Sequence, residues 1–106
     1  MGTILSPFCY TLTLGVASAQ ILPPNPSRKG LIFFNPSANT VSICPAVNAT
    51  GANQAAVLNG AGSISILSGG GMLVLPQPGW PDSVSFGSAF NGIASGANTP
   101  FTVWEL

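Results

Sequence analysis

The sequence predicts an all-β fold, an antiparallel β-sandwich or jelly-roll-like barrel of about eight short strands. Apolar residues recur mainly with a period of two, in short runs separated by turn residues. Thirteen glycines and ten prolines oppose long helices, and no window of helical length repeats apolar residues every 3.6 positions. The chain of 106 residues fits a single domain, residues 1–106.

The strands of the first half follow from alternation and apolar runs. Residues 8–14 alternate apolar side chains with cysteine and threonine, which is typical of a half-buried strand. Residues 30–35 (GLIFFN) are almost continuously apolar, so we expect a central strand covered on both faces. Shorter strands are predicted at 19–22, before two prolines, and at 40–44, before Pro45.

The second half is less regular. Residues 46–62 are small and amide-rich, which predicts a loop with a short strand or helical turn around 55–58. Three consecutive glycines, residues 69–71, predict a hairpin between the strands on either side of them. In the last strand, Phe101, Val103 and Glu105 share one face. The strands predicted after the loop are 63–67, 72–75, 84–86, 92–94 and 100–106.

The scarcity of charge bears on function. The chain has two basic residues, two acidic residues and no histidine, so no histidine-based nucleophile is available. Asp82 and Glu105 are the only carboxylates, and nothing suggests that they converge. We therefore predict no enzyme, no catalytic residue, no cofactor and no metal site. Two basic side chains release too few counterions for nucleic-acid binding, and no apolar run reaches the ~18 residues of a membrane span.

Three features bear on secretion. Cys9 and Cys44 match no metal-ligand spacing and could form one disulfide, although their β-prone neighbours favour buried free thiols. Residues 17–19 (ASA) resemble a cleavage site, but no basic residue precedes Arg28 and the apolar pattern alternates, so we expect no signal peptide. Residues 48–50 (NAT) match a glycosylation acceptor, a motif too short to carry weight without such a signal.

A small repeat brackets the strand at 30–35. The tripeptide NPS occurs at 25–27 and again at 35–37, and its residues are typical of turns. Arg28 lies at the entrance of this strand, and Glu105 lies in the terminal strand. If the two strands are neighbours, these side chains would form a partly buried ion pair. The alternative is two solvated ends, whose pairing would contribute about 0–1 kcal/mol.

The near absence of charge favours a protein that works inside an assembly, with much of its surface covered by neighbours. The alternative is a secreted domain that amides and hydroxyls keep soluble. Trp80 lies in a loop rich in proline and glycine, where it either packs over the loop or anchors a partner. Residues 1–15 could form an arm or an edge strand that contacts a neighbour. Phe8 and Tyr10 in this segment are, with Trp80, the candidate interface residues.

The segments QILPPNPSRKGLIFFNPSANTVSIC and FNGIASGANTPFTVWEL resemble small virion structural proteins of tailed bacteriophages. In that family a turn of the form Asn–x–x–Arg leads into an apolar strand ending in Asn, and the last strand closes in Val–x–Glu. The proline-rich approach to the arginine and the long small-residue middle depart from the family pattern. The matching residues are Asn25, Arg28, Leu31, Ile32, Asn35, Gly96, Val103 and Glu105.

This resemblance implies a β-sandwich found on phage heads and in fibres or tails. The leading interpretation is a capsid decoration (cement) protein on the virion surface, which binds the lattice of the major capsid protein and stabilises the head as a homotrimer. A second interpretation is a fibre, spike or tail module that binds a host glycan or another virion protein, with Trp80 and Tyr10 in the site. A third is a non-viral secreted β-sandwich.

Overall fold

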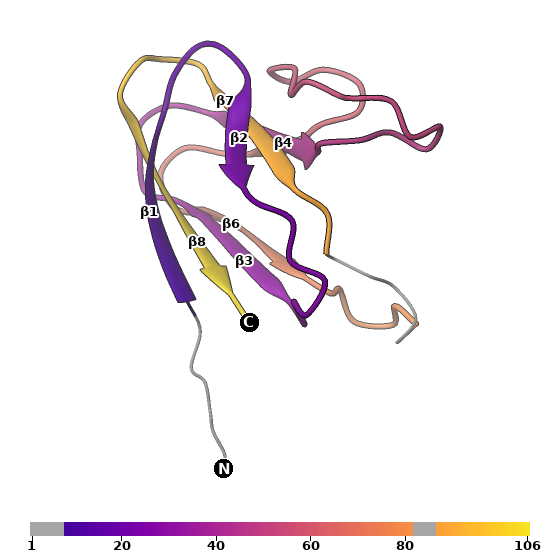
Figure 1. The fold of residues 1–106 in the computed structure, drawn as a ribbon. Coiled ribbons are helices and arrows are strands. Elements are labelled where there is room, and N and C mark those ends of the chain that lie inside the picture. Colours follow the sequence, from indigo (N-terminus) through magenta and orange to yellow (C-terminus); the bar gives the residue numbers. More distant parts are fainter. Residues whose placement is uncertain (1–7, 82–86) are drawn as a thin grey trace.

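A computed structural model describes residues 8–81 and 87–106, which form two packed antiparallel sheets of four strands each (Figure 1). Sheet A has the order β1-β8-β3-β6 and sheet B the order β2-β7-β4-β5. Consecutive strands alternate between the sheets except for β4 and β5, which is the topology of a jelly roll. The strands are β1 (Phe8–Leu14), β2 (Ala19–Leu22), β3 (Leu31–Asn35), β4 (Val41–Pro45), β5 (Ile64–Ile66), β6 (Gly71–Leu75), β7 (Phe90–Ala94) and β8 (Thr99–Glu105).

The predicted all-β sandwich is thus confirmed, and its core lies between the two sheets. Phe33 occupies the centre, with its ring centroid 5.5 Å from that of Phe90 and 6.3 Å from that of Phe101. In β8 the predicted alternation holds, because Phe101, Val103 and Glu105 are all buried. No helix in the described residues is long and apolar enough to cross a membrane.

β3 is central in sheet A, as expected, but the prediction that both of its faces are covered is wrong. Leu31 and Phe33 point into the core and are fully buried, whereas Ile32 and Phe34 are only partly buried. The apolar run at 30–35 led to this wrong prediction because it combines inward residues of the core with apolar residues that point outward. No described element packs over that outward face.

The glycine triplet does not form a hairpin. β5 pairs with β4 in sheet B, whereas β6 pairs with β3 in sheet A, so the turn carries the chain from one sheet to the other. Gly71 donates a backbone hydrogen bond to the carbonyl of Leu67, and a Cβ at Gly71 would lie 2.3 Å from that oxygen. Glycine is therefore required for this close approach of the backbone.

The remaining differences concern segments outside the main strands. Residues 46–62 form a loop, as expected, but residues 55–58 contain neither a strand nor a helical turn. Both cysteines are free, yet only Cys44 is buried; Cys9 is exposed because it points outward from the edge strand β1. The strand predicted at 84–86, Asp82 and the first part of the predicted arm, residues 1–7, lie outside the described residues.

Candidate interaction surface

The predicted partners Arg28 and Glu105 lie together between the sheets. Arg28 Nε donates to Glu105 Oε2 at 2.7 Å, and the two side chains are 0% and 5% exposed. The neighbouring guanidinium nitrogens donate to the carbonyl oxygens of Ser88 at 2.7 Å and Pro23 at 2.8 Å. Tyr10 donates its hydroxyl to the second carboxylate oxygen of Glu105 at 3.3 Å. We refer to Arg28, Glu105 and Tyr10 as the charged cluster.

This arrangement follows from the register of sheet A. Glu105 pairs with Leu31 of β3 on one side and with Phe8 of β1 on the other, so its side chain points inward beside Tyr10. Burial raises the pKa of the Tyr10 phenol above its usual value, and the charge and hydrogen bond of Glu105 raise it further. Because the ion pair is buried and bonded to the protein's own groups, we interpret the charged cluster as structural.

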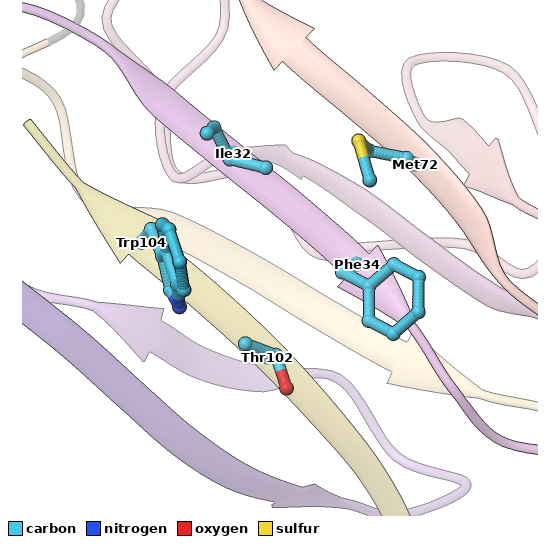
Figure 2. Close-up of a pocket in the computed structure, with 5 residues that line it drawn as sticks. All are labelled: Ile32, Phe34, Met72, Thr102 and Trp104. Atoms are coloured by element: carbon cyan, nitrogen blue, oxygen red, sulfur yellow. The ribbon is translucent and has the colours of Figure 1, made fainter.

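The outward side of β8, β3 and β6 is largely apolar, and no described element covers it. Two of its outward residues belong to edge strand β6, Met72 at 59% and Val74 at 41% exposed, and Trp104 of β8 is 44% exposed. Figure 2 shows five of the outward side chains projecting from the same side of β3, β6 and β8. They line an open depression of about 320 Å³ with one hydroxyl group, that of Thr102. We call this surface the open face: Ile32, Phe34, Met72, Val74, Thr102 and Trp104.

The outward side of sheet B is covered by the chain itself. The 46–62 loop lies over β4 and β7, and Asn59 donates its backbone N–H to Ser42 Oγ at 3.0 Å. The backbone oxygen of Gln54 accepts from the side chains of Asn91 and Cys44. Ser42 and Cys44 are therefore buried although they point away from the core. The loop therefore covers sheet B, whereas no segment of the described residues covers the open face of sheet A.

The three candidate interface residues are not brought together on one surface. Tyr10 is half-buried in the charged cluster, and Phe8 is 64% exposed at the start of β1. Trp80 is 44% exposed and borders a second apolar depression, of about 260 Å³, where the edges of β5 and β6 approach each other. Its lining includes Ile64, Leu73 and Phe90.

The sequence prediction missed the open face. Ile32, Phe34, Met72 and Trp104 sit at alternate positions of three different strands, and only the pairing register places them side by side. The apolar run at 30–35 was a signal for it, but the same run also fits a strand covered on both sides.

The described residues contain no group of three or more His, Cys, Asp or Glu side chains that could hold a metal ion. The chain matches no protein family, no curated protein and no solved structure.

Proposed function

We propose that this protein is a capsid decoration protein of a tailed bacteriophage, which binds the major capsid protein lattice through the open face of sheet A and stabilises the head. The open face carries the proposal. It is a largely apolar surface on three paired strands, it contains an open depression, and none of its six residues is charged. Exposed apolar patches of this kind mark protein–protein contacts.

The composition of the open face suits a protein partner. Trp104, Phe34 and Met72 belong to the residue types enriched at protein interfaces. A partly exposed tryptophan beside an open depression can anchor a partner side chain. Virion location rests on the resemblance of the NPSRKG turn and the terminal strand to phage structural proteins, and the near absence of charge fits a surface covered by neighbours.

Glycan binding is the competing function. Sugar sites combine an aromatic surface with several converging polar groups that fix orientation. The depression on the open face offers Trp104 and Phe34 but only the hydroxyl of Thr102. The depression beside Trp80 is also predominantly apolar, with Ser88 among its lining residues. Both depressions therefore fit an apolar protein surface better than they fit a glycan.

Counting the copies of this chain in purified particles of the encoding virus tests the location. Hundreds of copies per particle are expected for a decoration protein, because it follows the symmetry of the shell. Tens of copies or fewer would point to a fibre or tail part. Absence from the particle would overturn both interpretations.

The docking surface is tested by two matched valine substitutions. Val74→Lys places a charge on the open face, and Val57→Lys places the same charge in the loop over sheet B, at a valine of similar exposure (41% and 50%). Binding to capsids prepared without this protein should weaken about tenfold or more for Val74→Lys, because an unpaired lysine must be desolvated. Val57→Lys should bind as the wild type does. Equal affinities for the two variants would contradict docking through the open face.

A further inference from the structure

The four edge strands of the sandwich differ in how they are protected against pairing. β5 has three residues, β2 has four residues with an irregular register, and β6 is bounded by glycines and Pro76. Short length, irregularity, proline and charge are the usual devices that protect an edge. β1 has none of them: it is seven residues long, contains neither proline nor charge, and pairs with β8 over seven consecutive positions. On its other side no described strand pairs with it (Figure 1).

Along this edge the described residues also leave several inward-facing side chains only partly buried. In the neighbouring strand β8, the inward-facing Phe101 and Val103 are almost completely buried. On the inward side of β1, Leu14 is buried, but Leu12 and Tyr10 are only partly buried and Phe8 is 64% exposed. A further strand beside β1 would continue the inner surface and cover these side chains.

We propose that β1 pairs in antiparallel fashion with β1 of a second copy of this chain. The two-fold axis passes beside Thr11, and the two A sheets become one continuous sheet. In this register all seven residues of Phe8–Leu14 pair with those of the second copy, and residues of similar chemistry face each other. Thr11 faces Thr11 of the second copy on the outward side, and Tyr10 faces Leu12 on the inward side. Threonine–threonine and aromatic–aliphatic pairs across strands are stabilising.

A second copy is the occupant that the chemistry of this edge fits. A two-fold contact sets a strand against itself, so any charge on β1 would face a like charge nearby, and β1 has none. Thr11 and Thr13 are exposed on the outward side, so nothing there has to move. A trimer, by contrast, would need two different patches that fit head to tail.

The pairing would also enlarge the open face. A two-fold axis perpendicular to the sheet leaves both outward surfaces on the same side, so the dimer presents two open faces in one plane. Two linked contacts with a lattice bind more tightly than one. The dimer itself does not depend on the proposed function, because its formation is measured on the free protein.

The mass of the protein in solution tests the proposal. We expect the mass from light scattering to rise with concentration from 10.7 kDa toward twice that value. Thr11→Lys should give a monomer, because the two lysines would face each other across the axis. Val74→Lys adds the same charge to the other edge strand of sheet A and should leave the dimer intact. A wild type still monomeric at ~1 mM, a trimer, or equal behaviour of both variants would overturn the proposal.

Disulfide trapping tests the register. In the proposed dimer Cys9 and its copy lie four positions apart along the strands, roughly 14 Å, so wild-type protein should not cross-link through this pair. Cys9→Ser/Thr11→Cys brings two thiols directly opposite each other, within the Cα separation of about 4.4–6.8 Å that a disulfide spans. Mild oxidation should link this variant and not the wild type. Equal cross-linking of the two proteins would overturn the register.

Discussion

The two ends of β3 lie in buried polar clusters of different chemistry. Arg28, just before the strand begins, belongs to the charged cluster. Asn35, at its last position, donates to the carbonyl oxygens of Asn39 and Ile66 at 2.7 and 2.9 Å and accepts from the N–H and hydroxyl of Ser37. Asn39 in turn donates to the hydroxyl of Thr99 at 2.8 Å. We call Asn35, Ser37, Asn39 and Thr99 the amide cluster.

Both clusters join segments that are distant in sequence. The charged cluster connects β8 with the segments around Pro23 and Ser88. The amide cluster connects the end of β3 with Ile66 of sheet B, and the segment after β3 with Thr99 of β8. The difference lies in what remains when one partner is lost: a buried unpaired charge at one end, and neutral unpaired groups at the other. The first is far more costly in a low-dielectric interior.

Removal of one charge should have the largest effect on stability. Glu105→Ala leaves the guanidinium of Arg28 buried without its carboxylate, so we expect a loss of about 3–5 kcal/mol in the free energy of unfolding, measured with urea. Glu105→Gln keeps the shape and a hydrogen-bond acceptor, and should remain measurable if Glu105→Ala does not fold.

The double variant separates coupling from packing. Arg28→Met/Glu105→Gln removes both charges. Its loss of stability should therefore be smaller than the sum of the losses measured for Arg28→Met alone and Glu105→Gln alone. Additive losses would show that the two side chains do not interact, and would remove the contrast between the two ends.

Asn35→Ala should have the next largest effect. It leaves the buried N–H of Ser37 without its acceptor and removes the amide hydrogen bonds to the carbonyl oxygens of Asn39 and Ile66, which we expect to cost about 2–3 kcal/mol. Asn25→Ala is the matched control, because Asn25 begins the other NPS tripeptide and makes the same turn contact to Ser27 N at 3.1 Å, but in an exposed position. Its loss should be about 0.5–1.5 kcal/mol. Equal losses at both asparagines would mean that burial of the amide cluster contributes nothing.

The same contrast explains what the sequence could and could not predict. With four charged residues in the whole chain, Arg28 and Glu105 had few alternative partners, so a pair could be proposed once both strands were placed. The NPS repeat predicted two turns, and both asparagines do accept from the serine two residues on. The partners Asn39 and Thr99 could not be chosen among many similar amides and hydroxyls. The open face and the crossing at Gly69–Gly71 depend on strand order, which alternation alone leaves undetermined.

The smallest expected effect is a change in how stability depends on pH. It distinguishes the two ends of β3, because the charged cluster contains a phenol and the amide cluster does not. Tyr10 is the only tyrosine of the chain, and burial together with Glu105 raises its pKa in the folded state. The unfolded chain therefore releases this proton at lower pH than the folded chain. The stabilisation is complete below the ordinary pKa of about 10 and declines as the pH rises through the folded value.

Tyr10→Phe should remove this contribution, because phenylalanine has no ionisable hydroxyl group. Urea unfolding between about pH 9 and 11 should show a steeper loss of stability for the wild type than for Tyr10→Phe. At neutral pH the variant should lose only about 0.5–1.5 kcal/mol, the contribution of one hydrogen bond. Parallel pH profiles would mean that the phenol is not held against Glu105 in solution, and that the charged cluster consists of the ion pair alone.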